Sequence, residues 1–176
     1  MCTGEESRGT GGLFGALFPG KGEVGAFRVL KFLFESDDPF RERFLHWLEA
    51  SLNPKISLTN QLANSPKVLE LECRIDDHSE NCGRIDGAIE SSDYVVAIEG
   101  KFGAPFQNEQ LTRYQNWLLN KKDGKNKVLF VIVPSYRIPE VPTLANNTII
   151  TAIGTWESLV DCFSSVELES DKLNTV

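Results

Sequence analysis

Two acidic residues and a lysine near the middle of the chain have the types and spacing that phosphate chemistry requires. Asp86 lies in the run of residues 83–90, and Glu99 and Lys101 lie in the run of residues 93–101. Both runs are short and β-branched, and a polar turn joins them, which predicts a β-hairpin. Residues two apart on a strand share a face, so Glu99 and Lys101 point the same way. If the apolar faces of the two strands coincide, Asp86 lies beside Glu99 and Lys101. The three side chains can then hold a divalent metal and meet a phosphate.

The preceding segment, residues 68–75, alternates between apolar and polar residues and is expected to pair antiparallel with the first strand of the hairpin. Its polar face carries Glu70, Glu72 and Arg74 and is expected to join the face of Asp86. Glu70 or Glu72 is therefore a candidate for a further metal ligand or an assisting base, and the alternative is a solvated strand face. The apolar faces are expected to combine Leu69, Leu71, Cys73 and Ile75 with Ile85 and Ile89, and with Tyr94, Val96 and Ile98.

A helix is expected after the hairpin, over residues 105–122. Pro105 suits the first position of such a helix, and Asp123-Gly124 suits its end. Spacings of three and four residues place polar and aromatic side chains along one side of it, namely Gln107, Gln110, Tyr114 and Trp117. Leu111 and Leu118 are then expected to face the sheet.

These residues and their context resemble the PD-(D/E)XK nuclease superfamily, which has the restriction-endonuclease-like fold. That superfamily carries an Asp on one strand and a Glu/Asp-x-Lys element on the next. Here Asp86 in GRIDGAIE matches the first acid, and Glu99-Gly100-Lys101 in VVAIEGK matches the second element. Several bacterial branches place a Gln and a Tyr on the following helix, and Gln110 and Tyr114 in NEQLTRY match them. The likeness covers residues 68–133 well and the flanking helices loosely.

The resemblance implies a catalytic site and a cofactor. Catalysis is assigned to Asp86, Glu99 and Lys101. Metal binding is assigned to Asp86, Glu99 and the backbone carbonyl of Gly100. Glu72 is a further candidate ligand because of its place on the polar face of the preceding strand, not because of the resemblance. The implied cofactor is Mg²⁺, for which Mn²⁺ is expected to substitute.

The helix and the N-terminal region supply the remaining candidate residues. Gln110, Arg113 and Tyr114 are implied to line the site and to bind substrate; a polar rim on a packed helix is the alternative for Gln110 and Tyr114. The resemblance also suggests that an acid of the first helix approaches the site, which here is Glu23. A glutamate in a first helical turn is equally explained by the helix dipole, and that interpretation is preferred.

The implied activity is that of a metal-dependent nuclease hydrolysing phosphodiester bonds in nucleic acid. DNA is the expected substrate, and restriction or phage defence are candidate settings. The rival interpretation is a catalytically inactive module of the same fold that binds nucleic acid or a protein partner, because two carboxylates beside a lysine also form ordinary ion-paired sheet faces. A homodimer and a nuclease that needs a recruiting protein partner both remain open.

The composition is that of a globular protein of one domain. The chain has 176 residues, of which 41% are hydrophobic and 24% charged. Its four cysteines include no C-x-x-C pair and it has two histidines, so neither a structural zinc site nor a disulfide framework is expected. Free thiols suit a cytoplasmic location, and no membrane-spanning run or secretory signal is expected.

The formal net charge of −7 argues against a broad basic surface for nucleic acid. It does not exclude a nuclease, because carboxylates that bind a metal count as negative charge until the metal reverses the local field. Basic residues do cluster after the expected helix, at Lys121, Lys122, Lys125 and Lys127, with Arg113 upstream. They either contact nucleic acid or solvate the end of the helix.

The expected fold class is α/β with a mixed sheet and a restriction-endonuclease-like core. A loose N-terminal arm (residues 1–22) precedes a single domain (residues 23–165) and a frayed tail (residues 166–176). Two helices are expected first, over residues 23–35 and from an N-cap at Asp38 to about residue 52. After the crossover helix, residues 127–133 are expected to form a buried strand parallel to residues 93–101. A loop over residues 134–147, a strand over residues 147–153 and a helix capped by Thr155 complete the domain.

Overall fold

The computed structural model describes residues 22–52, 69–75, 83–107, 109–121, 123–144 and 149–164. Residues 1–21 of the expected arm and the whole of the expected tail lie outside these ranges. Five strands form one mixed sheet in the order β1-β2-β3-β4-β5. The strands are β1 (Leu69–Arg74), β2 (Arg84–Glu90), β3 (Tyr94–Gly100), β4 (Asn126–Val133) and β5 (Ile150–Thr155).

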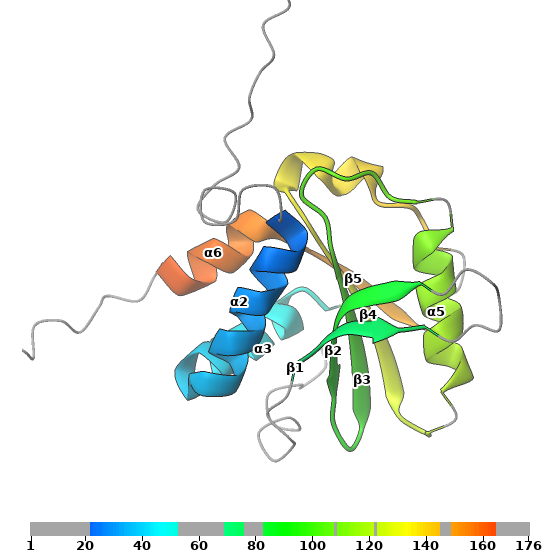
Figure 1. The fold of residues 1–176 in the computed structure, drawn as a ribbon, viewed down its shortest axis with the longest axis horizontal. Coiled ribbons are helices and arrows are strands. Elements are labelled where there is room, and N and C mark those ends of the chain that lie inside the picture. Colours follow the sequence, from blue (N-terminus) through cyan, green and yellow to red (C-terminus); the bar gives the residue numbers. More distant parts are fainter. Residues whose placement is uncertain are drawn as a thin grey trace, which may run out of the picture.

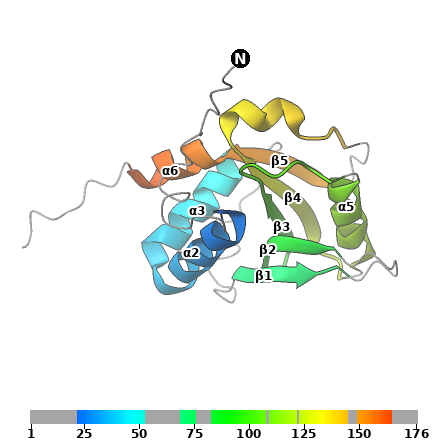
Figure 2. The same ribbon diagram turned by 45° about the horizontal axis from the view of Figure 1, so that its top comes forward.

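The first three strands are an antiparallel meander, and β4 and β5 continue the sheet in parallel with β3. Figures 1 and 2 show helices on both sides of the sheet. One side carries α2 (Gly22–Ser36), α3 (Asp38–Ala50) and α6 (Trp156–Ser164), and the other carries α5 (Gln110–Asn120). The predicted mixed α/β architecture and the parallel pairing of the two central strands are confirmed.

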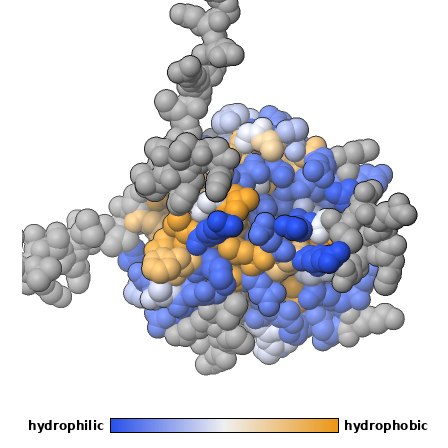
Figure 3. All heavy atoms as spheres, in the orientation of Figure 1, coloured by the Kyte–Doolittle hydropathy of each residue, from blue (hydrophilic) through white to orange (hydrophobic). Residues whose placement is uncertain are grey.

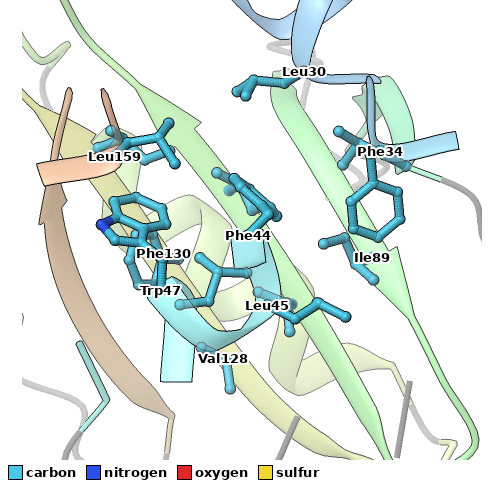
Figure 4. Packing of buried hydrophobic residues seen from close by; sticks show 14 of the residues in the cluster. Leu30, Phe34, Phe44, Leu45, Trp47, Ile89, Val128, Phe130 and Leu159 are labelled. Carbon is cyan, nitrogen blue, oxygen red and sulfur yellow. The ribbon is translucent and has the colours of Figure 1, made fainter. Parts of the chain in front are cut away.

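The core is divided by the sheet into two clusters. Figure 4 shows the larger cluster, in which side chains of α2, α3 and α6 meet Ile89, Val128 and Phe130. The smaller cluster packs Leu111, Tyr114 and Leu118 of α5 against the opposite face, where Val95, Ala97, Leu129 and Val131 lie. Every residue of β3 is buried, so the strand that carries Glu99 is covered on both faces.

The predicted faces of β1 and β2 are wrong at the ends nearest the candidate site. In β1, Leu69 packs in the larger cluster, whereas Ile75, just after the strand, packs in the smaller one. In β2, Ile89 packs in the larger cluster and Ile85 in the smaller one. In β1, Glu72 has a φ of 51°, in the left-handed region, so the regular alternation of side chains stops there. The paired residues of β2 and β3 end at Gly87 and Ile98, so the hairpin strands lose their regular pairing before they reach Asp86 and Glu99.

Local hydrogen bonds explain where several elements begin. The β2–β3 turn is fixed by Ser91, whose Oγ accepts from the amides of Tyr94 and Asp93 at 3.0 and 3.3 Å. The predicted cap of α6 is confirmed, because Thr155 Oγ1 accepts from the amide of Ser158 at 3.0 Å. The cap of α3 is Asp37 rather than Asp38, since its carboxylate accepts from the amide of Phe40.

The crossover helix begins later than the sequence suggests, at Gln110 instead of Pro105. The side chain of Arg137 binds two carbonyl oxygens of the segment that precedes Pro105. Arg137 belongs to a short 3-10 helix, η1 (Ser135–Glu140), within the segment that was expected to be a loop.

Hydrophilic residues cover most of the face shown in Figure 3, and apolar residues reach the surface around α2 and α6. Within the described part of the chain, every helix is too short or too polar to cross a bilayer.

Candidate active site

Asp86, Glu99 and Lys101 come together where β2 and β3 separate. The carboxylate of Asp86 accepts a 2.9 Å hydrogen bond from the amide of Gly100, which would otherwise continue the hairpin ladder. Lys101 Nζ lies 2.8 Å from Glu99 Oε1. The opening of the hairpin thus brings the two acids and the lysine into one cluster, as their spacing predicts.

Glu99 is the most buried of the three, with 1% of the residue exposed. Its Oε1 accepts hydrogen bonds from Lys101 and, at 2.6 Å, from Gln110 Nε2. Its Oε2 is buried and has no hydrogen-bond partner. Burial, followed by the charge of Asp86, raises the pKa of Glu99 to about 7 even though Lys101 opposes this shift.

Asp86 is also partly buried, and the pKa of its carboxyl group is likewise raised. Burial raises its pKa above the ordinary value, while the Gly100 amide and Lys101 limit the rise. Two neighbouring carboxylates with raised pKa values favour binding of a positive charge at this position.

Lys101 remains a cation in this setting. Burial alone would lower its pKa, but the contact with Glu99 and the charges of Glu23 and Asp86 outweigh burial and hold the pKa above its ordinary value. The side chain therefore supplies a fixed ammonium group and three hydrogen-bond donors; it is not suited to act as a base near neutral pH.

Gln110 and Tyr114 support Glu99 from α5. Gln110 Nε2 donates to Glu99 and, at 2.7 Å, to Tyr114 Oη, and its carbonyl oxygen accepts from the amide of Gln107. Tyr114 donates to the carbonyl of Arg84 at 2.8 Å. Burial and the nearby Glu99 raise the pKa of Tyr114, so it stays neutral. Both side chains are buried and contact the acid cluster, which places them behind Glu99.

Glu23 also reaches the site, so the helix dipole alone does not explain this residue. Its Oε1 accepts a 2.8 Å hydrogen bond from the amide of Phe102, one residue after Lys101. Its charge acts on both Asp86 and Lys101. The approach of a first-helix acid, which the resemblance implies, is thus present in the geometry.

Three candidate residues lie apart from this cluster. Glu72 is exposed and pairs with Arg84 at 3.5 Å. Arg113 donates to Gln107 at 3.4 Å, near the beginning of α5. Glu70 likewise faces Cys73, at 3.8 Å, and lies on the wall of a different cavity.

Gly100 is required by packing, although the motif leaves the residue type at this position open. A Cβ at this position would lie 2.5 Å from Phe27 and 2.9 Å from Trp156. These two aromatic side chains, together with Arg137, are neighbours of the site that the sequence did not reveal. All three come from segments remote from the motif, and nothing in their local sequence points to the site.

The basic cluster mainly serves the junction between α5 and the hairpin. Lys121 and Lys125 pair with Glu90 at 3.7 and 2.6 Å, and Lys127 pairs with Asp123. Lys121 also lies over the ring of Trp117. Lys122 lies outside the described residues.

Two open cavities flank α5. Asp86, Glu99 and Lys101 line neither of them. One, of about 470 Å³, lies beside the hairpin turn and includes Trp117. The other, of about 500 Å³, is lined by Gln110 and by residues of the adjoining loops. Gln110 therefore connects this second cavity with Glu99.

The donor set of the cluster fits a hard divalent cation. Its ligands are carboxylate oxygens, one of which is buried without a partner, and such oxygens are what Mg²⁺ prefers. Across the described ranges, no group of three or more His, Cys, Asp or Glu side chains is arranged to hold a metal ion. Asp86 and Glu99 would therefore need water and substrate oxygens to complete a coordination shell.

Comparison with known proteins identifies the family. A family model described as the PD-(D/E)XK nuclease superfamily matches residues 34–163, which is well over half of the chain. No curated protein and no solved structure matches the chain significantly. The matched range includes all five strands and the residues of the acid–lysine cluster. Since the five-stranded mixed sheet also agrees with a restriction-endonuclease-like fold, the chain belongs to the PD-(D/E)XK nuclease superfamily.

Proposed function

We propose that this protein is a metal-dependent nuclease that hydrolyses phosphodiester bonds, with DNA as its substrate. The observation that carries the proposal is the buried Oε2 of Glu99, which has no partner in a cluster that also holds Asp86 and a protonated Lys101. A buried carboxylate oxygen without a partner is costly, and binding of a cation removes that cost.

Asp86 and Glu99 are the residues that would hold Mg²⁺ or Mn²⁺. When bound, such an ion acidifies a water molecule and offsets the negative charge of the phosphoryl group. The carbonyl of Gly100 is a further proposed ligand. Its amide already fixes the orientation of Asp86.

Lys101 supplies the positive charge for the reaction. Its ammonium group can donate to the attacking water or to a non-bridging oxygen of the phosphate, and both contacts strengthen as charge develops. Glu99 fixes the position of Nζ at 2.8 Å, and Gln110 fixes the position of Glu99. The lysine is therefore held in place before substrate arrives, which reduces the reorganisation that the reaction requires.

Two observations favour an inactive binding module as the second candidate. The net charge is −7, and Lys121, Lys125 and Lys127 are already paired with acids. The Glu99–Lys101 contact could then be only a buried ion pair that stabilises the end of β3.

A cleavage assay separates the two candidates. The wild-type protein is incubated with single- and double-stranded DNA and RNA in the presence of Mg²⁺, Mn²⁺ or EDTA. We expect cleavage of DNA with either metal and none with EDTA. Binding without cleavage in every condition would support the inactive module, and cleavage of RNA alone would correct the proposed substrate.

A further inference from the structure

The chain leaves the sheet immediately after the candidate lysine. The pairing of β3 with β4 ends at Gly100 and Ile132, and the amide of Lys101 makes one more bond, 2.8 Å long, to the carbonyl of Ile132. Backbone polar groups beyond this point have no strand partner, yet such groups need partners when they are buried. Their partners decide how firmly the segment from Lys101 to Ala104 is held.

Three side chains from three different elements bind the backbone of this segment. Trp156 Nε1, at the start of α6, donates to the carbonyl of Lys101 at 3.0 Å. Glu23, in α2, accepts from the amide of Phe102. Arg137, in η1, donates from one nitrogen, Nη1, to two carbonyl oxygens, at 3.1 Å to Phe102 and at 3.0 Å to Ala104. Figures 1 and 2 show η1 beside the loop that follows β3.

Arg137 is oriented for this task by its own surroundings. Only 5% of the residue is exposed, although the 3-10 helix that carries it is otherwise mostly exposed. Its Nε and Nη2 donate to Glu140 Oε2 at 2.8 and 2.7 Å, which fixes the plane of the guanidinium group. A lysine in its place could not span both carbonyls and the carboxylate, because an ammonium group lacks the planar fork of donors.

We propose that Arg137 is a positioning residue for Lys101: it holds the backbone that follows the lysine, so that the ammonium group stays at the acid cluster. This inference rests on the nuclease function proposed above. Arg137 does not contact Asp86 or Glu99; it acts through the carbonyls of Phe102 and Ala104. Small displacements of a reacting group can cost on the order of 100-fold in rate, so a modest loosening of this segment is sufficient for a measurable effect.

The test compares Arg137→Gln and Arg137→Lys with a matched control at another buried arginine. Arg41 is 7% exposed and, like Arg137, binds a backbone carbonyl, that of Phe34, and a nearby carboxylate, that of Asp38. It lies at the junction of α2 and α3, and Phe34 is about 16 Å along the helix from Glu23 at a rise of about 1.5 Å per residue. Arg41→Gln should therefore lower stability without moving Lys101.

Four quantities are measured on each full-length variant, at a temperature where all variants are folded. They are kcat and KM for DNA cleavage, the affinity for Mn²⁺ by calorimetry, and hydrogen exchange of the Phe102 amide by NMR. For Arg137→Gln we expect kcat to fall about 10- to 100-fold with little change in KM. Mn²⁺ affinity should stay within about twofold of wild type because Asp86 and Glu99 are intact, and exchange at Phe102 should be faster. Arg137→Lys should lie between Arg137→Gln and wild type, and Arg41→Gln should match wild type in all four quantities.

Unchanged kcat and unchanged exchange in Arg137→Gln would overturn the proposal, as would an equal loss of kcat in Arg41→Gln. If Arg137→Gln does not fold, Glu140→Gln takes its place, since Glu140 is half exposed and only orients the guanidinium group. It should then show a smaller fall in kcat with faster exchange at Phe102, and wild-type behaviour would overturn the proposal. If the wild type cleaves no nucleic acid, the proposed nuclease function fails and with it the effect on kcat, whereas the exchange measurement still decides whether Arg137 holds the segment.

Discussion

The side chain of Gln110 bridges Glu99 and Tyr114, donating to Glu99 Oε1 at 2.6 Å and to the tyrosine oxygen at 2.7 Å. Through this bridge the crossover helix α5 fixes the acid that β3 carries. The sequence motif on the helix and the motif on the strand are therefore parts of one hydrogen-bonded unit.

This bridge predicts the effect of removing Gln110. Gln110→Ala should reduce kcat, because Glu99 loses the donor that orients it. It should also lower the free energy of unfolding by about 1–3 kcal/mol, the usual cost when buried polar groups lose a partner. Urea denaturation and steady-state kinetics measure the two effects.

Gln115 provides the control for this prediction. It is on the same helix, is 2% exposed and donates to Thr151 rather than to the site. Gln115→Ala should lose stability and retain kcat. Equal losses of kcat in both variants would show that Gln110 acts only through the stability of the helix.

The close packing around Gly100 predicts that a larger residue there lowers the stability of the protein, independently of any charge. Gly100→Ala places a Cβ 2.5 Å from a ring carbon of Phe27, so the aromatic neighbours must shift. We expect a loss of about 1–3 kcal/mol, as is typical when a packed core is overfilled. Gly103→Ala is the control, since a Cβ there has no atom within 4 Å. Thermal unfolding of both proteins measures the difference, and equal melting temperatures would contradict the packing at Gly100.

Much of the fold follows from the sequence, because its strongest signals are local. The continuous apolar run around Phe130 predicts a strand buried on both faces, and the helix before it predicts parallel pairing with β3; both are observed. The cap at Thr155 follows from side-chain chemistry alone. The predicted proximity of Asp86, Glu99 and Lys101 is observed, although the regular hairpin pairing from which it was inferred ends one residue before Asp86 and Glu99.

The failures of sequence-based prediction have physical reasons. The faces of β1 and β2 could not be assigned by alternation, because Glu72 adopts a left-handed backbone and the hairpin opens beside it. The start of α5 at Gln110 could not be inferred from Pro105, because proline suits a turn as well as a first helical position. The role of Glu23 depends on where α2 docks against the loop after β3, and tertiary packing decides this.

The proposed metal site predicts that loss of the Asp86 carboxylate weakens metal binding and that loss of the Glu72 carboxylate does not. Asp86→Ala should weaken Mn²⁺ binding at least about tenfold, the lower end of the usual effect of losing groups that support a metal site. Glu72→Ala should bind Mn²⁺ like the wild type, since Glu72 pairs with Arg84 away from the cluster. Calorimetry measures both affinities. Equal binding by Asp86→Ala and the wild type would exclude Asp86 as a ligand, and weaker binding by Glu72→Ala would restore Glu72 as one.

The raised pKa of Glu99 predicts how the stability of the metal-free protein depends on pH. A carboxyl group whose pKa rises from 4.5 to about 7 on folding binds a proton more tightly in the folded state. Its contribution to stability is complete below about pH 4.5 and is lost as the pH rises through about 7. In EDTA, the free energy of unfolding should therefore fall between about pH 5 and about pH 8, by up to about 3 kcal/mol at about 1.4 kcal/mol per pKa unit.

Glu99→Gln is the control for this pH dependence, because the amide keeps the shape of the side chain and does not titrate. Its stability should change less with pH over the same range, and above about pH 7 it should exceed that of the wild type in EDTA. Urea denaturation across the pH series measures both proteins. Identical pH profiles would show that Glu99 is not the titrating group.

The central claim is that Lys101 acts in the reaction as a cation, and the rate of DNA cleavage by Lys101→Met tests it most directly. Methionine keeps much of the volume of the stem and removes the charge. The variant is compared with wild type under single-turnover conditions with Mg²⁺, after calorimetry has shown that it still binds the metal. We predict a fall in rate of about 100-fold or more, as is typical when a positioned donor to the transition state is lost, and poor recovery in Lys101→Arg. Cleavage by Lys101→Met at close to the wild-type rate would contradict the account and leave Lys101 as no more than the partner of Glu99 in an ion pair.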